Sequence, residues 1–546
     1  MKTLQTVASA SGERAKVYER LNVVFVNLGL VALSALLFAL SFPNLLTMWG
    51  FYPLAYIALV PLFVVVHRAG WIGIFLYGFF AGFVSYVFLN YWLVAFHPLT
   101  IFIVPGIYAI YFLILLPVMK LADSWFPRYG YLVQLLLWMG FEYLRTLGFL
   151  GYSYGIMGYS QYLFLPLVRL SALTGVWGVS MLVVFPSTFL GNALRNGFHG
   201  APEFLRKHRI DVVIFVAIFA GAVVYGLASK VDYSKSREWR VALVQQDVDP
   251  WRGGLPTYRE SLVRSIRQSE RALKEHPEIV IWSETSFVPA IDYHMRYRDD
   301  PESDTVVQDL LSFMAKQPVP YVIGNDDGEL QSSASGQLRR VDYNAVLMFK
   351  GRTIAQTYRK IRLVPFTENF PYRKQLPWIY NALVKADTHF WKEGHEYTVF
   401  NADGVKFSTP ICFEDTFGYL SRQFIRHGAQ VIVNLTNDSW SYSVPASMQH
   451  MQMAVFRATE NARSVVRSTN GGMTTIIDPN GKLLELYPAF VEGYMIGNVP
   501  VYTGRETLYT DWGDWFAELC LWLGLGTLVA GGIFAAIRMK GRNLRS

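Results

Sequence analysis

Long apolar runs fill the first part of the chain and return near its end. A helix that crosses a bilayer needs roughly 20 mostly apolar residues. By that measure the sequence predicts about eight transmembrane helices, of which the run at 129–147 is unusual in carrying Glu142 and Arg145. The predicted spans cover residues 22–42, 51–66, 71–94, 100–119, 129–147, 168–192, 210–228 and 516–537.

The charges of the short connecting loops predict how these helices are oriented. Lysine and arginine collect in alternate loops and in the C-terminal tail, whereas the loops at 43–50 and 95–100 carry no charged residue. Because cytoplasmic loops are enriched in lysine and arginine, both chain ends are expected in the cytoplasm. Seven spans then place the region after residue 228 on the outer side, the periplasm of a bacterium.

Between the seventh and eighth predicted spans the pattern changes to short apolar strands that alternate with helices. Runs such as EIVIW (278–282) and QVIVNLT (430–436) are β-branched and end in polar residues. Helical stretches at 258–276 and 446–465 alternate with them, which predicts an α/β domain. The predicted division is a transmembrane bundle at 1–228, this α/β domain at 229–514, and a final helix with a cytoplasmic tail at 515–546.

The composition agrees with a membrane protein. Hydrophobic residues make up 52% of the 546 residues and charged residues 16%, against roughly 25% charged in soluble domains. The net charge of +8 does not indicate nucleic-acid binding, because the basic residues gather at the ends of apolar segments. Two cysteines exclude a disulfide scaffold, and the ten histidines lack a zinc-binding spacing, so neither a metal nor a cofactor is expected.

Three residues at the ends of predicted strands form a chemically sufficient set for acyl transfer. Glu284 follows EIVIW, Lys360 ends RTIAQTYRK, and Cys412 ends GVKFSTPIC. A thiol nucleophile needs a base, because the thiolate is the reactive form, and a positive group or N–H donors where an oxyanion develops. Taken singly, a cysteine that ends an apolar strand is usually an inert core residue, and Cys520 in the last apolar segment is expected only to pack.

The sequence around these residues resembles the nitrilase superfamily, whose members carry Glu, Lys and Cys in this order. The matching segments are WSET around Glu284, YRKIRLVPFTE around Lys360 and ICFED around Cys412. The flanks are closer to one membrane branch, the apolipoprotein N-acyltransferases, and this resemblance covers nearly the whole chain. Further matching segments are FEYLR (141–145), GYSQ (158–161), NLTNDSW (434–440), QHMQMAVFRATENARSVVRSTNGG (449–472) and DWGDW (511–515).

The resemblance implies a polytopic α-helical membrane bundle joined to a nitrilase-like αββα sandwich. It implies a ping-pong acyl transfer at a bacterial inner membrane, with a phospholipid as donor, phosphatidylethanolamine being expected. The implied acceptor is the N-terminal amine of a diacylglyceryl-cysteine lipoprotein. In this scheme Glu284 is the general base, Cys412 forms a thioester, and Lys360 stabilises the oxyanion.

Two acidic residues near the triad are expected to support it. Glu368 and Glu414 are predicted to hold the charge and orientation of Lys360. The chain departs from the family pattern at Ser283, where a proline is usual, and at Phe413, where a tyrosine is common. Neither departure touches a triad group, so both bear on substrate fit and on the orientation of the carboxylate. The backbone N–H of Phe413 is expected to face the oxyanion.

Aromatic and polar residues on predicted loops are expected to contribute to substrate binding. They are Trp251, Asn437 and Trp440. The segment FPYRKQLPWIYNALVKADTHFW (370–391) is expected to form a mobile, lipid-facing lid, with simple packing as the alternative explanation of its aromatic residues.

Two other functions fit the same triad. A membrane-anchored amidase or nitrilase would let water, rather than an amine, resolve the thioester. The predicted spans and the apolar segment at 370–391 are unnecessary for a small soluble amide, which favours the acyltransferase. A catalytically inactive transporter or scaffold is the third possibility, and the intact triad argues against it.

Overall fold

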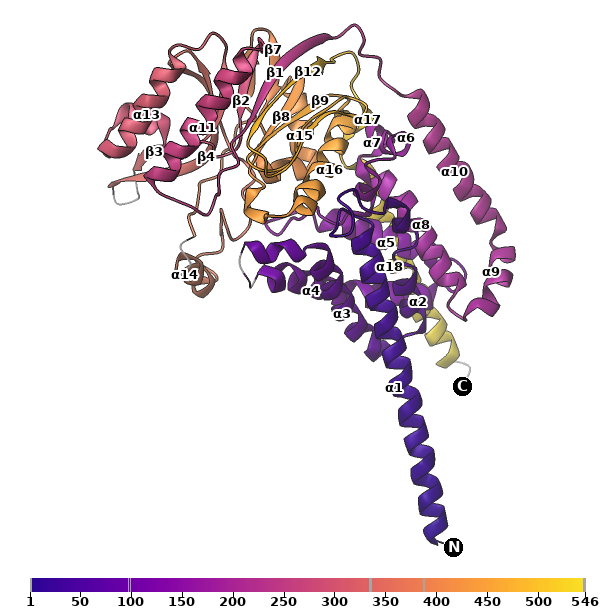
Figure 1. The fold of residues 1–546 in the computed structure, drawn as a ribbon. Coiled ribbons are helices and arrows are strands. Elements are labelled where there is room, and N and C mark those ends of the chain that lie inside the picture. The colour runs from indigo at the N-terminus through magenta and orange to yellow at the C-terminus, as the bar shows by residue number, and fades with distance from the viewer. Residues whose placement is uncertain (1, 97, 99, 333–335, 386–387, 544–546) are drawn as a thin grey trace. The chain divides into compact units, whose positions relative to one another are not determined.

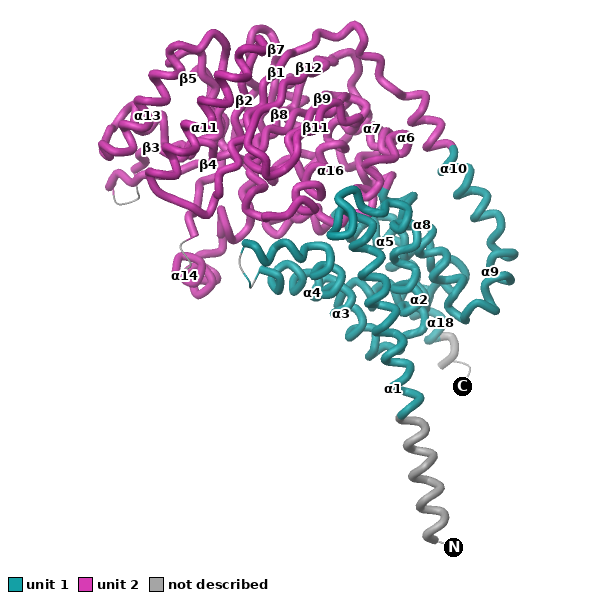
Figure 2. The backbone as a smooth tube through the Cα atoms, viewed as in Figure 1, with its two compact units in different colours: residues 1–143, 180–220, 517–546 teal, residues 144–179, 221–516 magenta. Residues whose placement is uncertain are grey.

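The chain forms two compact units in a computed structural model, which describes residues 2–543 except 97, 99, 333–335 and 386–387 (Figures 1 and 2). The helical unit comprises the described residues of 1–143, 180–220 and 517–546. The sandwich unit comprises those of 144–179 and 221–516. Three helices continue from one unit into the other: α8 (Val176–Ala193), α10 (Arg209–Ala228) and α18 (Trp515–Asn543).

The helical unit consists of apolar helices, which satisfy their backbone hydrogen bonds internally and so suit a lipid environment. Its other helices are α1 (Lys2–Leu40), α2 (Val60–Arg68), α3 (Trp71–Leu89), α4 (Thr100–Trp125), α5 (Gly130–Leu144) and α9 (Ala201–Lys207). Short 3-10 helices lie between them: η1 (Tyr52–Tyr56), η2 (Tyr91–Ala95) and η4 (Phe198–Gly200).

Within the described residues, six helical segments are long and apolar enough to cross a membrane, judged by length and composition. They are Tyr18–Leu40, Trp71–Leu89, Thr100–Trp125, Val176–Ala193, Arg209–Ala228 and Trp515–Lys540. The predicted polytopic bundle is therefore confirmed, with six such helices where about eight were expected.

The other two predicted spans form shorter helices. The run at 51–66 is divided between η1 and α2. The run at 129–147 forms α5, whose 15 residues rise about 22 Å, against a hydrocarbon core of roughly 30 Å. In both places the run of apolar residues extends beyond the ends of the helix.

Glycines allow α3 and α4 to pack closely. A Cβ atom at Gly78 or Gly82 of α3 would overlap the backbone carbonyl of Phe112 or Tyr108 of α4. Small residues bring helix backbones together where lipid supplies no hydrophobic drive for association. A larger side chain at either glycine would separate the two helices.

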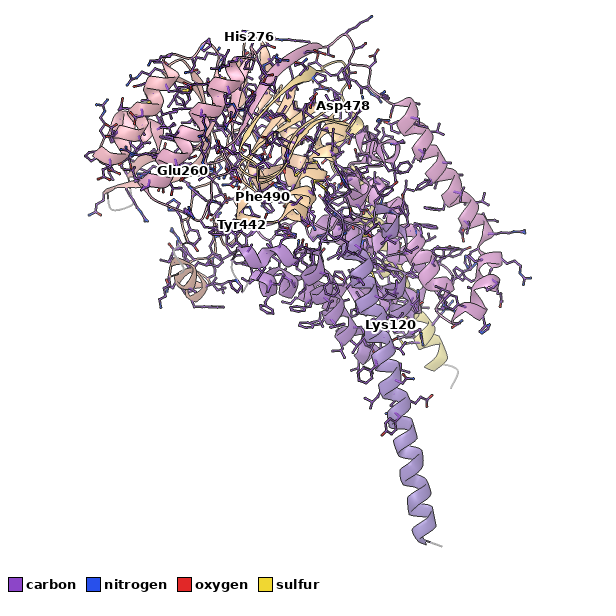
Figure 3. All side chains as sticks on the ribbon, viewed as in Figure 1. Lys120, Glu260, His276, Tyr442, Asp478 and Phe490 are labelled. Atoms are coloured by element: carbon purple, nitrogen blue, oxygen red, sulfur yellow. The ribbon has the colours of Figure 1, made fainter. Side chains whose placement is uncertain are left out.

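A buried lysine stabilises the end of a helix inside the helical unit. Lys120 of α4 (Figure 3) donates from Nζ to the carbonyl oxygens of Val66 and His67 at 3.0 and 3.2 Å. Both carbonyls lie in the last turn of α2, where they lack partners within the helix. A cation at this end is also favoured by the helix dipole.

Two six-stranded sheets form the core of the sandwich unit. Each has three parallel strands in its middle and antiparallel strands on both sides. The first sheet has the order β12 (Gly493–Val501), β1 (Arg237–Gln245), β2 (Ile279–Trp282), β3 (Tyr321–Ser332), β4 (Leu338–Lys350), β5 (Thr353–Arg359). The second has the order β11 (Leu483–Tyr487), β10 (Thr474–Ile477), β9 (Ser464–Thr469), β8 (Val431–Thr436), β7 (Val405–Ser408), β6 (Val399–Ala402).

Helices cover the outer face of each sheet, so the layers follow the order αββα (Figure 1). Alternate strand residues point to opposite faces: Val280 and Trp282 pack under the helices on the first sheet. Towards the other sheet, the rings of Trp239 and Phe407 lie 5.3 Å apart. The helices are α11 (Leu255–Leu273), α12 (Ile291–Arg296), α13 (Pro301–Met314), α15 (Gly418–Arg426), α16 (Val444–Asn461) and α17 (Leu508–Trp512).

The predicted α/β sandwich is confirmed element by element. The strands predicted at 278–282 and 430–436 are β2 and β8, and the helices predicted at 258–276 and 446–465 are α11 and α16. Each lies within a few residues of its predicted bounds. The carboxyl ends of β2, β5, β7 and β8 carry the residues singled out for chemistry.

Residues 144–179 pack with the sandwich and contact α16. Arg457 donates to the hydroxyl of Tyr159 at 3.1 Å, and Glu460 accepts from the backbone N–H of Val176 at 3.2 Å. The segment that resembles the family at GYSQ is therefore part of the unit that holds the strand ends. Its helices are η3 (Met157–Gln161), α6 (Leu165–Val168) and α7 (Ser171–Thr174).

Candidate active site

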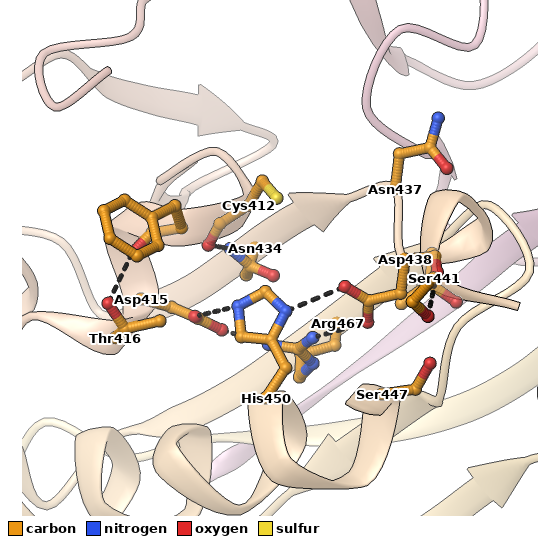
Figure 4. A network of polar contacts seen from close by, with 12 residues as sticks. Cys412, Asp415, Thr416, Asn434, Asn437, Asp438, Ser441, Ser447, His450 and Arg467 are labelled. Atoms are coloured by element: carbon orange, nitrogen blue, oxygen red, sulfur yellow. Dashed lines mark hydrogen bonds and ion pairs between the residues drawn. The ribbon is translucent and has the colours of Figure 1, made fainter. Parts of the chain in front are cut away.

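Cys412 lies just beyond β7, at the start of the 3-10 helix η5 (Cys412–Thr416). Its backbone φ is +48°, in a left-handed region that residues other than glycine rarely adopt and that recurs at active sites. The side-chain amide of Asn434 on β8 donates to the carbonyl oxygens of Pro410 and Cys412 at 3.1 and 3.2 Å (Figure 4). These contacts hold the thiol at the edge of the second sheet, where its residue is partly exposed.

Glu284 follows β2 of the first sheet, and its buried carboxylate has fixed partners. Oε1 accepts from Nδ2 of Asn344 at 2.9 Å and from Nζ of Lys360 at 3.4 Å. Oε2 accepts from the backbone N–H of Asn437 at 2.9 Å. Because Asn437 follows β8, the carboxylate joins the two sheets at the end where Cys412 lies.

Lys360 follows β5 and is fully buried. Its ammonium donates to Oε1 of Glu368 at 2.8 Å as well as to Glu284. Its backbone N–H donates to the carbonyl of Asn344 at 2.8 Å, and the second oxygen of Glu368 accepts from the N–H of Val364 at 2.8 Å. Two carboxylates, Glu284 and Glu368, therefore share the lysine, and the predicted supporting role of Glu368 stays a prediction.

The charges in this cluster shift one another's protonation. Burial raises the pKa of Glu284, against the opposing charge of Lys360 and hydrogen bonds that include one with the Cys412 thiol. Burial and then Glu284 raise the pKa of Cys412, while Lys360 lowers it. Burial alone would lower the pKa of Lys360, but Glu368 and Glu284 together hold it above its ordinary value. The lysine thus stays cationic beside a carboxylate and a thiol that can exchange a proton.

Glu414 supports the cluster through the backbone. Its carboxylate accepts from the N–H groups of Ile361 and Arg362 at 2.8 and 2.9 Å, and from that of Ile411 at 2.7 Å. It therefore ties the residues that follow the buried lysine to the residue that precedes the cysteine. Burial raises the pKa of Glu414, and the Ile411 and Arg362 N–H groups oppose this shift.

The remaining predicted site residues lie at different distances from the triad. The ring of Phe413 packs edge-on against Phe417 at 4.9 Å, and its N–H belongs to the first turn of η5, where N–H groups lack partners within the helix. Asn437 holds Glu284 through its backbone, as described above. Trp251 is 47% exposed on the loop between β1 and α11, and Trp440 is partly exposed in η6 (Ser439–Ser441).

The segment 370–391 is largely exposed. It contains α14 (Pro377–Lys385), none of whose residues is buried, and the side chain of Trp378 is 70% exposed. At its start, the ring of Tyr372 contacts that of Phe149 at 5.5 Å. Residues 386–387 of this segment lie outside the described residues, and its action as a lid remains a prediction.

A second buried cluster lies close to Cys412 and was not predicted from the sequence (Figure 4). His450 of α16 contacts Asp415 through Nε2 and Asp438 through Nδ1, both at 2.8 Å. Arg467 of β9 pairs with Asp415 and, at 3.4 Å, with Asp438. Burial would lower the pKa of His450, but the two carboxylates raise it to about 9. The imidazole is therefore protonated at neutral pH and donates from both nitrogens.

These four residues, which we call the quartet, connect the two loops that carry the site: Asp415, Asp438, His450 and Arg467. Asp415 belongs to η5, three residues after Cys412, and Asp438 follows Asn437 directly. The signal that could have indicated this cluster is the presence of charged residues in segments that are otherwise buried. A buried charge requires a partner of opposite charge or a hydrogen bond. Among the residues that the structure describes, no group of three or more His, Cys, Asp or Glu side chains is suited to hold a metal ion.

Comparisons with known proteins cover both units. The carbon-nitrogen hydrolase family matches residues 240–509, and the apolipoprotein N-acyltransferase N-terminal domain matches residues 34–189. The chain is 44% identical over 513 residues to apolipoprotein N-acyltransferase 1 of Treponema denticola, covering 91% of this chain and 94% of the relative. It is 41% identical over 526 residues to apolipoprotein N-acyltransferase 1 of Treponema pallidum, covering 94% and 96%. Among solved structures, Saccharomyces cerevisiae Nit3 of the nitrilase superfamily matches with a TM-score of 0.35 and 20% identity, covering 48% of this chain and 90% of Nit3.

Proposed function

This chain belongs to the apolipoprotein N-acyltransferase family, and we propose that it carries the acyl chain as a thioester on Cys412 during transfer. The observation that carries this proposal is the convergence of Cys412, Glu284 and Lys360 in one cluster. The proposed donor is a membrane phospholipid, phosphatidylethanolamine being expected. The proposed acceptor is the N-terminal amine of a diacylglyceryl-cysteine lipoprotein.

In the first half-reaction the thiol becomes the nucleophile. Glu284 takes the proton of Cys412, and the thiolate attacks an ester carbonyl of the phospholipid. Lys360 and the backbone N–H of Phe413 stabilise the oxyanion that forms. When the intermediate collapses, the carbon–oxygen bond breaks and the lysophospholipid leaves with the proton from Glu284, so that the acyl group remains on Cys412 as a thioester.

In the second half-reaction the amine resolves the thioester. The amine attacks the thioester carbonyl, Glu284 takes the amine's proton, and Lys360 again stabilises the oxyanion. Collapse forms the amide and breaks the carbon–sulfur bond. The sulfur of Cys412 then takes the proton back from Glu284, and the starting state is restored.

The membrane helices explain how both substrates reach the site. Each substrate holds acyl chains in lipid, and every methylene exposed to water costs about 0.8 kcal/mol. A multi-pass enzyme can receive both at the membrane surface. We propose the inner membrane of a bacterium, with the sandwich in the periplasm. Five of the long apolar helices precede the sandwich strands and one follows them, and an odd number supports that orientation as the predicted seven did.

The predicted division of labour is part of the proposal. Residues 1–228 and 515–546 anchor the enzyme, and residues 229–514 carry the chemistry. Residues 144–179 belong to the unit that holds the catalytic sandwich, although they precede its strands in the chain. The exposed segment 370–391, with Trp378 on α14, supports a role as a lid that contacts lipid.

The direct test supplies purified enzyme with phosphatidylethanolamine and a diacylglyceryl-cysteine lipopeptide, and follows the lipopeptide by mass spectrometry. We expect the lipopeptide to gain one acyl group in amide linkage. A lipopeptide with an acetylated amine is the matched control and should stay unmodified. Release of free fatty acid while the lipopeptide with a free amine stays unmodified would instead identify a hydrolase.

A further inference from the structure

A cavity lined by both polar and apolar residues lies beside the catalytic base and is not used in the mechanism above. Its volume is about 230 Å³, far more than the roughly 10–15 Å³ that one water needs. Asn437 lines it, and the N–H of this residue donates to Glu284 at 2.9 Å. Thr285, another lining residue, follows Glu284 directly. In Figure 4 the side chain of Asn437 and the sulfur of Cys412 both project away from the His450 network.

The cavity contains a buried donor without a partner. Gln246 is 1% exposed and lines the cavity, and its Nε2 has no hydrogen-bond partner. Its Oε1 accepts from the hydroxyl of Ser283 at 2.8 Å, which fixes the amide so that the N–H₂ group remains available. Such an unpaired donor is what a ligand's carbonyl oxygen would satisfy.

The other lining groups are held in place before any ligand binds. The side-chain amide of Asn470 donates to the carbonyl of Val248 at 2.9 Å and to Oδ1 of Asn437 at 3.2 Å. Its own oxygen accepts from the N–H of Val248 at 3.0 Å. The loop after β1 and the loop after β8 therefore form one rigid wall, and little ordering entropy would be lost on binding.

The charge of the lining distinguishes between possible ligands. Arg252 is the one cation in it, and its guanidinium pairs with Asp249 at 3.6 Å. A phosphate-bearing headgroup needs uncompensated cations or several convergent N–H groups, and an acyl chain would leave the buried Nε2 of Gln246 unpaired. The remaining polar groups are neutral, such as the amides of Gln246 and Asn470 and the hydroxyl of Thr257. Such a wall matches the alternating N–H and C=O groups of a peptide.

We propose that this cavity binds the polypeptide of the acceptor, namely the residues that directly follow its lipidated cysteine. The proposal rests on the proposed function, because it concerns only the second half-reaction. Gln246 donates to a backbone carbonyl of the acceptor, and Ser283 positions Gln246. The cavity thereby orients the amine towards the thioester on Cys412 and selects a lipoprotein over a lipid amine.

The test compares two acceptors in wild-type enzyme and in Gln246→Ala. One acceptor is a diacylglyceryl-cysteine lipopeptide with four further residues, and the other is diacylglyceryl-cysteine amide with none. In Gln246→Ala we expect KM for the lipopeptide to rise about fivefold to tenfold, the size of one hydrogen bond. KM for the amide should change by less than about twofold, since only the lipopeptide occupies the cavity. The rate of thioester formation from phosphatidylethanolamine should also change by less than about twofold in Gln246→Ala.

Two further measurements keep the test decisive. Ser283→Ala should raise KM for the lipopeptide in the same direction by a smaller factor, and Val263→Ala, on the exposed side of α11, is the matched control. In the wild type, the lipopeptide should have a lower KM than the amide, which tests the proposal even where Gln246→Ala does not fold. Equal KM values for the two acceptors in the wild type, or an increased KM for phospholipid in Gln246→Ala, would overturn the proposal. Failure of the proposed function would look different, because wild-type enzyme would then form no thioester.

Discussion

Two buried polar clusters lie within a few residues of each other in the sandwich unit, and they differ in how their charges balance. In the quartet, Asp415 and Asp438 face His450 and Arg467, so that two anions meet two cations. In the triad cluster, Glu284 and Glu368 share a single lysine. The Cys412 thiol is neutral, so this cluster keeps one negative charge in excess, and Glu284 can exchange a proton with the thiol to which it is hydrogen-bonded. A cluster whose charges balance serves as framework, whereas one with a carboxylate in excess beside a thiol can react.

The two clusters are also joined covalently. Cys412 and Asp415 belong to the same five-residue helix η5, and Asn437 and Asp438 are consecutive residues. The quartet therefore holds Cys412 and the loop that binds Glu284 in register. This arrangement predicts that substitutions in the triad cluster reduce activity more than stability, and that substitutions in the quartet do the reverse.

The largest loss of activity is expected from Glu284→Gln. The amide keeps the size of the side chain and an oxygen to accept from Asn344, but it cannot take the thiol proton. We expect kcat to fall roughly 10²- to 10⁴-fold, the usual contribution of a general base. The measurement is amide formation under saturating lipopeptide. Glu270→Gln, at an exposed position of α11, is the control and should behave as wild type; a loss below tenfold in Glu284→Gln would assign the base elsewhere.

Lys360→Met removes the cation that two carboxylates share. Methionine fills a similar volume, but the oxyanion loses its charged partner, so kcat should fall roughly 10²- to 10³-fold. Two buried carboxylates are left without a cation, which should also cost about 3 kcal/mol of stability. Activity assays and thermal unfolding in detergent measure the two effects. Lys274→Met, at an exposed position, should change neither, and full activity in Lys360→Met would contradict the assigned role.

His450→Gln sharpens the contrast from the side of the quartet. Glutamine leaves one of the two carboxylates uncompensated, so the free energy of unfolding should drop by about 3 kcal/mol. The protein that remains folded should keep kcat within about tenfold of wild type, because no reacting atom is touched. His276→Gln, at an exposed histidine (Figure 3), is the matched control. An activity loss as large as that of Glu284→Gln, with unchanged stability, would make His450 catalytic instead.

The smallest expected effect is the pH dependence of stability. The pKa of His450 in the folded protein is about 9, above the unfolded value of roughly 6.5. Its contribution is therefore complete below about pH 6.5 and is lost as the pH rises through 9, amounting to about 2 kcal/mol between pH 6.5 and 8.5. Melting temperature against pH measures this slope. The slope should disappear in His450→Gln, and its persistence there would assign it to other groups.

The sequence predicted those parts of the molecule that depend on local pattern. Strands such as β2 and β8 follow from β-branched runs with polar ends, and the strand ends located Glu284, Lys360 and Cys412. The quartet could not be predicted in this way, because no local pattern pairs Asp415 with Arg467, and neither residue stands at the end of an apolar strand. They meet only through the register of the second sheet and the packing of α16 on it.

The departures from expectation in the membrane part have a physical origin as well. Apolar composition does not determine where a helix begins or ends, and α5 ends at Leu144, before the end of the apolar run. Arg145, which follows, donates to the backbone carbonyls of Tyr152 and Tyr154 at 3.3 and 2.8 Å. It thereby fixes the turn that carries residues 144–179 into the sandwich unit. This contact is set by tertiary structure and leaves no periodic signal.

Intact-protein mass spectrometry of enzyme incubated with phosphatidylethanolamine alone tests the central claim most directly. The account predicts that wild-type protein gains the mass of one acyl chain, that hydroxylamine removes it, and that Cys412→Ala gains nothing. An adduct of the same mass on Cys412→Ala, or no adduct on the wild type, would contradict the claim that the thiol of Cys412 in the triad cluster carries the acyl group.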